Sequence, residues 1–275
     1  MTVIHEINTA HLPEIIAIIK EQYGYDFSGY AEASFQRRLN AFMHHRNIKD
    51  VYSLKYFLLN DKDTFSYLLE KITVNVTTMF RNPDFFLELK EKIFPILASY
   101  PVIRIWHAGC ATGQEVYSVC ILLKEAGLLH RTNIYATDIN PQNIKTARAG
   151  SLPLSEMKEY IRNYNLAGGT EGFSEYYNIE NNRAVINKDL LSKVIFSRHN
   201  LVTESSFNEF NLILCRNVMI YFNRQLQDKV IGLFNDSLTP GGFLALGDKE
   251  SLITSAHSKT FTRYLNTQKV YKKKL

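Results

Sequence analysis

The residues with the clearest chemical pattern are two glycines and one carboxylate near the middle of the chain. Gly109 and Gly113 follow the short β-branched segment 102–106, and Asp138 ends the next apolar segment. Because glycine has no side chain, neighbouring backbone N–H groups can approach a ligand closely, and a carboxylate one strand away can accept hydrogen bonds from both ribose hydroxyls. The pattern predicts a nucleoside cofactor, although the glycine spacing alone is also typical of a tight turn between a strand and a helix.

The start of the helix expected after Gly113 favours a cation over a phosphate. Gln114 and the carboxylate Glu115 stand where a pyrophosphate would need a third glycine and an uncluttered helix amino terminus. S-adenosylmethionine suits these residues, since it has an adenosine for Asp138, no phosphate, an ammonium group and a positively charged sulfonium. Methyl transfer is therefore the leading chemistry.

The segments around these residues alternate between strand and helix patterns. Residues 102–106, 133–137 and 210–215 read as short buried strands, and each is followed by apolar residues at helical spacing. This alternation predicts an α/β fold with a Rossmann-like, mostly parallel sheet. Residues 243–246 read as one more buried strand, and 261–271 could add an edge pair that makes the sheet mixed there.

Three domains or segments follow from the same patterns. Residues 12–69 have helical spacing and no clear strand, so we expect an all-helical domain at 1–73. A linker at 74–88 is expected to contribute to the cofactor site, and 89–275 to form the methyltransferase domain.

A small antiparallel β insertion is expected at about 173–192 within that domain. A hairpin that turns at Asn181 and Asn182 would place Tyr177 opposite Ile186. The glycine-rich residues 168–172 before it read as a flexible joint.

Composition and charge restrict the class of protein. The chain has 275 residues, 45% of them hydrophobic, with 32 basic and 27 acidic side chains, which is enough for real cores and excludes disorder. The formal charge of +5 is too mild to predict a nucleic acid partner. Cys110, Cys120 and Cys215 show no metal-type spacing, and no apolar stretch is long enough to span a bilayer. We expect a cytoplasmic monomer without a metal and without membrane insertion.

Four sequence blocks together resemble the CheR-type chemotaxis receptor glutamate O-methyltransferases. They are 75–81 (NVTTMFR), 109–118 (GCATGQEVYS), 136–139 (ATDI) and 215–222 (CRNVMIYF). The order and spacing of the blocks and the helical amino-terminal domain are also similar, so the resemblance covers nearly the whole chain. It implies that S-adenosylmethionine is used to methylate receptor glutamates, giving glutamate methyl esters and S-adenosylhomocysteine. The last block also lacks the Pro-Pro sequence common in amine methyltransferases, which favours an oxygen nucleophile.

The resemblance, together with the glycine pattern, implies a set of site residues. Arg81 and Tyr221 are expected to face the reaction centre, although Tyr221 could equally be a packing aromatic on sequence grounds. Without the resemblance, Arg216 could be an ion-pairing residue, and Asn75 and Thr77 could simply shape a turn. The expected cofactor contacts are Asn75, Thr77, Arg81, Gly109, Glu115, Asp138, Asn200, Leu201, Arg216 and Asn217.

The expected substrate surface lies on the basic helix of the amino-terminal domain. Arg37, Arg38 and Arg46 stand there in a stretch without any acidic residue, which could steer acidic receptor helices toward the site. A solvated helix face is the alternative. The implied partners are the cytoplasmic helical domains of chemotaxis receptors, and in some family members the β insertion also docks the receptor's carboxyl-terminal peptide by strand addition.

The sequence departs from the family pattern in places. Gln114 and Val116 stand where Glu and Pro are usual, and Asp248 and Lys249 where His and Ser are common, so the rim of the cofactor pocket could differ. Two other functions stay open: a methyltransferase for a small molecule or RNA, and a non-catalytic S-adenosylmethionine-binding regulatory module that would not need Arg81 and Tyr221.

Overall fold

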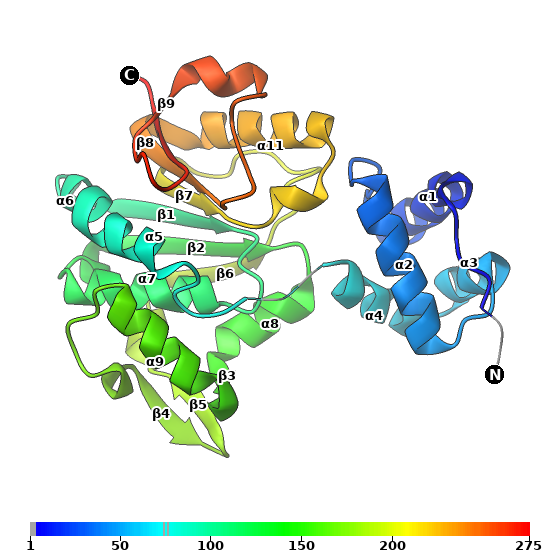
Figure 1. The fold of residues 1–275 in the computed structure, drawn as a ribbon, viewed down its shortest axis with the longest axis horizontal. Helices are drawn as coiled ribbons and strands as arrows, with labels where there is room; N and C mark the ends of the chain where they lie inside the picture. Colours follow the sequence, from blue (N-terminus) through cyan, green and yellow to red (C-terminus); the bar gives the residue numbers. More distant parts are fainter. Residues whose placement is uncertain (1–3, 74, 76) are drawn as a thin grey trace.

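The amino-terminal lobe is built from helices with one apolar side each. The computed structural model describes residues 4–73, 75 and 77–275, and this lobe lies beside a larger α/β lobe (Figure 1). Asp50 and Asp61 begin two of its helices by accepting hydrogen bonds from backbone N–H groups of the first turn. The core is fully buried at Ile15, Leu39 and Leu54, one position on each of three helices. The helices are α1 (Leu12–Tyr23), α2 (Glu32–Arg46), α3 (Val51–Asn60) and α4 (Lys62–Ile72).

The larger lobe is organised by one mixed sheet. Its strands lie in the order β6 (Val194–Arg198), β2 (Thr132–Asp138), β1 (Ile103–Ala108), β7 (Phe210–Cys215), β8 (Leu238–Leu246), β10 (Val270–Lys273) and β9 (Phe261–Arg263). The strands from β6 to β8 are parallel, and β10 is antiparallel to both of its neighbours. The predicted Rossmann-like sheet with a mixed edge is confirmed.

The order of the strands fixes where a ligand can bind. From β1 the chain moves outward to β2 and β6, and then returns to the other side of β1 to form β7 and β8. The connections on the two sides of β1 therefore diverge, which opens a crevice at the carboxyl ends of β1 and β7.

Helices cover both faces of the sheet because its strands alternate between two cores. In β1, Ile103 and Ile105 join one core, whereas Trp106 and Ala108 join the other. Figure 1 shows α7, α8 and α9 on one side of the sheet and α11 on the other. The helices of this lobe are α5 (Pro83–Glu88), α6 (Phe94–Leu97), α7 (Gln114–Glu125), α8 (Pro141–Ala149), α9 (Met157–Leu166), α10 (Lys188–Leu191) and α11 (Arg224–Ser237).

The segment that joins the lobes packs into the larger one. A π-helical turn, Leu89–Ile93, connects α5 to α6, and Phe85, Phe86 and Leu89 are buried in the core on the α7 side of the sheet. The proposed division at residue 88 falls inside this helical run. We therefore propose that α5 is part of the methyltransferase domain and not of the linker.

The β insertion is a three-stranded antiparallel sheet in the order β3 (Ser151–Pro153), β5 (Arg183–Ile186) and β4 (Tyr177–Glu180). Tyr177 pairs with Ile186, and Asn181 and Asn182 both have positive φ, as a type I′ turn requires. The predicted hairpin and register are confirmed. The third strand, β3, was not predicted, because a three-residue strand is too short to show a period.

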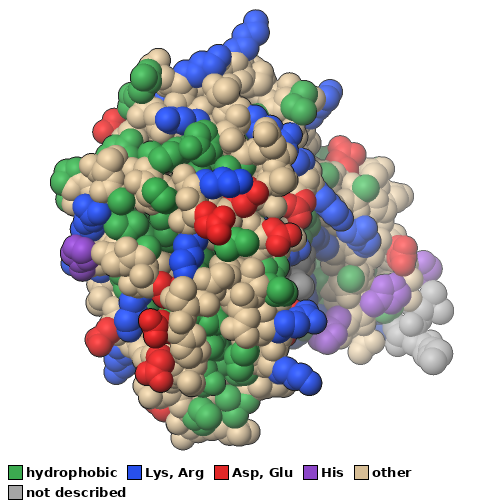
Figure 2. All heavy atoms as spheres, turned by 60° about the vertical axis from the view of Figure 1, so that its left-hand side comes forward, with side chains coloured by type: hydrophobic (Ala, Val, Ile, Leu, Met, Phe, Trp, Pro, Cys, Tyr) green, Lys and Arg blue, Asp and Glu red, His purple; other side chains and the backbone are tan. Residues whose placement is uncertain are grey.

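The surface and the cysteines add few constraints. On the face drawn in Figure 2, basic and acidic side chains are interspersed and no broad basic patch forms. Cys110, Cys120 and Cys215 are buried and free, and burial raises the pKa of each thiol. Among the residues that the structure describes, none of the helices is both long and apolar enough to cross a membrane.

Truncating the sheet core should destabilise the larger lobe. Ile213 in β7 is 0% exposed, whereas Ile253 is 81% exposed. Ile213→Ala should lower the free energy of unfolding by about 2–5 kcal/mol through lost burial and a cavity, and Ile253→Ala should change it by less than about 0.5 kcal/mol. Urea unfolding followed by circular dichroism measures both, and equal effects would contradict the placement of β7 in the core.

Candidate functional site

A single cavity lies at the carboxyl ends of the parallel strands, where the strand order predicts a crevice. Loops after β1, β2, β6 and β7 line it together with parts of the joining segment and of the amino-terminal lobe. All of the residues expected to contact the cofactor line this cavity, and so does Tyr221. The structure therefore brings these residues together, while their individual roles stay predictions.

The glycine loop is shaped by close packing as well as by its backbone angles. Gly109 has φ +82°, and a Cβ built on it would lie 2.5 Å from Cγ2 of Val218. Gly113 has φ +99°, and its Cβ would lie 2.4 Å from the hydroxyl of Tyr117. Both glycines are thus required by the turn. The turn also brings Gly109, Cys110 and Ala111 to the cavity wall. The segment is therefore a tight turn that also lines the cavity.

Asp138 is held rigidly at the end of β2. Its Oδ2 accepts a hydrogen bond from the N–H of Ala111 at 2.9 Å, and its Oδ1 accepts from the N–H of Asn140 at 2.9 Å and from Asn143 Nδ2 at 3.0 Å. Burial raises the pKa of Asp138, although these hydrogen bonds act in the opposite direction. Asn143 Nδ2 also donates to Asn75 Oδ1 at 2.7 Å, which ties the joining segment to the same carboxylate.

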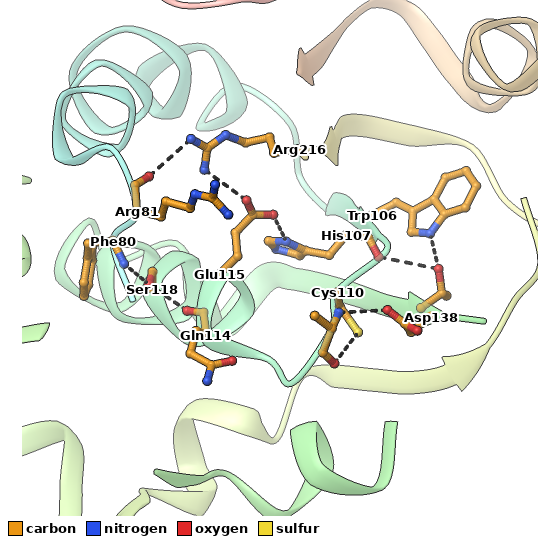
Figure 3. A network of polar contacts seen from close by, with 12 residues as sticks. Phe80, Arg81, Trp106, His107, Cys110, Gln114, Glu115, Ser118, Asp138 and Arg216 are labelled. Carbon is orange, nitrogen blue, oxygen red and sulfur yellow. Dashed lines mark hydrogen bonds and ion pairs between the residues drawn. The ribbon is translucent and has the colours of Figure 1, made fainter. Parts of the chain in front are cut away.

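A buried charge network connects β1, α7, β7 and the joining segment (Figure 3). Arg216 Nη1 lies 3.1 Å from Glu115 Oε2, and Nη2 donates to the carbonyl of Arg81 at 3.2 Å and to Asn82 Oδ1 at 3.1 Å. The other carboxylate oxygen of Glu115 lies 3.0 Å from His107 Nδ1. The ion pair between Arg216 and Glu115, together with polar contacts to His107 of β1 and to the joining segment, therefore holds these four parts of the chain together.

This network changes how Glu115 and Arg216 are interpreted. Glu115 was expected to offer a negative charge to a cation, but its carboxylate is paired inside the protein. Burial raises the pKa of Glu115, yet the hydrogen bond from His107 and the charge of Arg216 outweigh it and leave the pKa lowered. Arg216 forms an ion pair, as the structural alternative to cofactor binding predicted. Its guanidinium also lies 4.0 Å from the centre of the Phe85 ring.

The loop after β7 carries Tyr221 and is fixed by a carboxylate that the sequence analysis did not assign to the site. Glu250 is 4% exposed and accepts hydrogen bonds from the N–H groups of Asn217 at 3.0 Å, Val218 at 2.9 Å and Met219 at 2.7 Å. Tyr221 follows in the short 3-10 turn η6 (Met219–Tyr221) and is half-buried. No local pattern could have found Glu250, because it lies far along the chain from the loop it holds.

Arg81 lines the cavity from the joining segment. In Figure 3 its side chain extends in the direction of Glu115, and both residues line the cavity. Arg81 and Arg216 supply two positive charges to the lining, and Glu115 and Asp138 supply two negative ones. A zwitterionic ligand would meet both signs of charge there.

The remaining expected contacts come from the joining segment and from the loop after β6. Asn200 Oδ1 accepts a hydrogen bond from the N–H of Val202 at 2.9 Å, as in an ordinary loop, while Leu201 is buried and also lines the cavity. Asn75 and Thr77 are half-buried at the cavity wall. The structural and the ligand-binding interpretations are both compatible with these positions.

The three arginines expected to bind substrate do not share one environment. Arg37 is exposed on α2, and the Arg46 guanidinium lies 5.4 Å from the centre of the Tyr67 ring. Arg38 instead lies over the ring of Tyr221 at 4.2 Å from its centre. Arg38 therefore contacts a residue of the cavity lining, whereas Arg46 contacts a residue of the amino-terminal lobe.

Some cavity residues were not predicted. His199 directly precedes Asn200 and lines the cavity with its side chain 5% exposed, and among the described residues its Nδ1 has no hydrogen-bond partner. Tyr30 of the amino-terminal lobe also lines the cavity. His199 could have been predicted, because it is next to Asn200 in the sequence. Tyr30 could not, because its place at the cavity depends on how the two lobes pack.

The departures from the family pattern have different surroundings in the structure. The side chain of Gln114 accepts a hydrogen bond from Thr112 Oγ1 at 2.7 Å, and Val116 is fully buried in the core. Asp248 Oδ2 accepts a hydrogen bond from Asn82 Nδ2 at 3.1 Å. Within the described ranges, three or more His, Cys, Asp or Glu side chains do not gather as metal ligands would.

Replacing Glu115 by Gln should lower the free energy of unfolding at neutral pH by about 1–3 kcal/mol, because Arg216 would stay buried without its counter-charge. Since the pKa of Glu115 is lowered in the fold, its charge stabilises the protein above about pH 4.3, the usual pKa of glutamate, and this contribution is lost as pH falls through the folded value. Urea unfolding between pH 7 and pH 3 should therefore show the two proteins converging in acid.

The exposed Glu209→Gln variant controls for the removal of one negative charge. A difference between wild type and Glu115→Gln that stays constant over the whole pH range would contradict the assignment of an ionised Glu115 in the network.

Comparison with known proteins matches both lobes to one family. Residues 10–73 match the CheR methyltransferase all-alpha domain, and residues 75–269 match the CheR methyltransferase SAM binding domain. The chain is 44% identical over 259 residues to a Pseudomonas putida protein that carries the name methyltransferase Cher3, covering 94% of this chain and 95% of that one. It is 29% identical to the chemotaxis protein methyltransferase of Listeria innocua, covering 87% and 89% of the two chains. The chain therefore belongs to the CheR methyltransferase family, whose methyl donor is S-adenosylmethionine.

Proposed function

We propose that the protein methylates glutamate side chains of chemotaxis receptors and gives glutamate methyl esters and S-adenosylhomocysteine, acting as a monomer on the cytoplasmic helical part of the receptor. The observation that carries this proposal is the shared cavity. The glycine loop, Asp138, Arg81 and Tyr221 line it together, and the basic helix α2 contacts Tyr221 through Arg38.

The side chains of the cavity suit S-adenosylmethionine. Asp138 is oriented by three N–H donors, and its oxygens would accept hydrogen bonds from ribose hydroxyls. Arg81 would face the carboxylate of this ligand, while Glu115 and Arg216, which are paired with each other, line the cavity beside it. When bound, this cofactor supplies a methyl group on a positively charged sulfur.

The reaction requires the protein to orient the reacting groups and does not require it to transfer a proton. A glutamate carboxylate is already ionised at neutral pH, so no general base is needed. An anion and a cation become two neutral groups on transfer, and a cavity drier than water favours that change. Correct alignment of the reacting atoms is worth roughly 7–11 kcal/mol when it is fully realised.

Arg81 and Tyr221 are the residues we assign to that orientation. The guanidinium of Arg81 would pair with the carboxylate of the cofactor, and the hydroxyl of Tyr221 would donate one hydrogen bond to the reacting carboxylate of the substrate. One neutral donor suits the task, because a stronger hold on the substrate oxygen would stabilise the ground state and slow the attack.

The receptor helix would approach over α2. Arg37 is exposed, and His45 and Arg46 lie against Tyr67 on the same lobe, so this lobe carries basic groups that could meet acidic receptor helices. The β insertion offers a second contact. β4 is an edge strand with Ile179 66% exposed, and an extended receptor peptide could be added there as a further strand.

Methyl-labelled S-adenosylmethionine and a receptor signalling fragment test the proposal. The label should be released as methanol by base, since esters hydrolyse and methylamines do not. Tyr221→Phe should lower kcat by about tenfold or more, the effect of losing one hydrogen bond in the transition state, and Arg81→Ala should lower it further. Tyr264→Phe, a change at a tyrosine in the β9–β10 connection, is the matched control.

Two outcomes would favour the other functions. Base-stable label would indicate a methyltransferase for another acceptor. Tight binding of S-adenosylhomocysteine without transfer to any receptor fragment would indicate a regulatory module.

Reversing a charge on α2 tests the substrate surface. Arg37→Glu should raise the KM for the receptor fragment several-fold, and more at low salt, because electrostatic steering is weakened. The affinity for S-adenosylhomocysteine, measured by calorimetry, should not change. Arg162→Glu on α9 makes the same charge change at an exposed position, and kinetics that do not distinguish the two variants would refute the α2 surface.

A further inference from the structure

We propose that Arg38 is a positioning residue for methyl transfer: it holds the Tyr221 ring in place from the amino-terminal lobe. The inference rests on the proposed function, because it takes Tyr221 to face the reacting carboxylate. Arg38 Cζ lies 4.2 Å from the centre of the Tyr221 ring. Its Nη1 also donates to the carbonyl of Ile72 at the end of α4. The guanidinium is therefore held by one hydrogen bond and by its contact with the Tyr221 ring.

The backbone of Tyr221 is held from the same lobe. The N–H of Ala31 donates to the carbonyl of Tyr221 at 2.9 Å, and the N–H of Asn223 donates to the carbonyl of Gly29 at 2.8 Å. Tyr30 and Phe222 form a β-bridge between these segments, and their ring centres lie 5.1 Å apart. The loop is therefore joined to the amino-terminal lobe at Tyr221 and at the two residues that follow it.

The contact between the lobes is too close to permit much sliding. A Cβ built on Gly29 would lie 2.8 Å from Cδ2 and 2.9 Å from Cβ of Leu226, in the first turn of α11. Helix α11 follows directly after Asn223, whose side chain caps it by accepting from the N–H of Leu226 at 2.9 Å. The position of Arg38 relative to Tyr221 is thus set by backbone packing.

The stack limits what the Tyr221 side chain can do. A planar guanidinium on one face of the ring removes the freedom of the ring to turn in that direction, so the hydroxyl is presented along one line. Misplacing a group near reacting atoms by a small distance can lower a rate on the order of a hundredfold. A lysine would keep the charge but could not stack in this way.

This assignment separates Arg38 from its neighbours on α2. Arg37 is exposed and suits a docking surface, whereas Arg46 lies over Tyr67. Arg38 contacts a residue that lines the cofactor cavity. Charge steering would respond to net charge at this position, whereas positioning responds to the shape of the side chain.

Kinetics of Arg38→Lys and Arg38→Met separate these cases. Both variants should lower kcat by at least tenfold while the KM values for cofactor and receptor fragment stay within about twofold. In a Tyr221→Phe background, Arg38→Lys should have little further effect, because the two residues act as one unit. Arg162→Lys on α9 is the matched control. A raised receptor KM with unchanged kcat, or full activity of Arg38→Lys, would overturn the proposal.

A measurement that needs no activity keeps the inference separate from the proposed function. 3-Fluorotyrosine placed at position 221 should show a shifted and broadened ¹⁹F resonance in Arg38→Lys and Arg38→Met, and an unchanged resonance in Arg162→Lys. If no receptor fragment is methylated but the resonance responds, the proposed function fails and the contact stands. If the resonance does not respond in folded variants, Arg38 does not position Tyr221.

Discussion

The guanidinium of Arg216 joins three parts of the chain that the cavity needs in one place. It comes from the end of β7, pairs with Glu115 at the start of α7, and binds the carbonyl of Arg81 in the joining segment. Taking a charge out of water is costly, so a buried arginine requires such partners, and removing one of them leaves a charge that nothing compensates. The contact with Phe85 adds an apolar face to the same group. The cavity wall is therefore preorganised by the protein's own charges.

The amino-terminal lobe completes the site as well as presenting a surface. Tyr30, Ile72 and Thr73 line the same cavity as the residues of the sheet lobe. The backbone bonds at Gly29 and Ala31 fix the loop after β7 from outside. If a partner docks on this lobe as proposed, its binding would be linked to the cavity through these short contacts. This arrangement gives a physical reason for the two domains to remain in one chain.

Local patterns were sufficient for most of the helices and strands and for the glycine loop. Strand periods, the Asn181 turn and the glycine loop all depend on neighbouring residues, and each could be predicted for that reason. Residues 168–172 were expected to form a flexible joint, but a Cβ on Gly169 would lie 2.1 Å from the Tyr164 ring, and the N–H of Thr170 binds Glu125. Here glycine serves close packing, which composition alone does not distinguish from flexibility.

The parts that could not be predicted depend on distant residues. Glu250 holds the loop that begins at Asn217, and Arg38 meets Tyr221 across the lobes, and neither pair is close in sequence. The resemblance to a family supplied the list of site residues, since their types alone also fit turns and surface ion pairs. Their geometry required the folded chain.

The three buried cysteines have a practical consequence. Their thiols are shielded and held in the protonated form by burial, so they should react slowly with maleimides. A single new cysteine on each lobe could then carry a fluorescent dye pair without first removing the native ones, and the distance between the lobes could be followed while a receptor fragment is added.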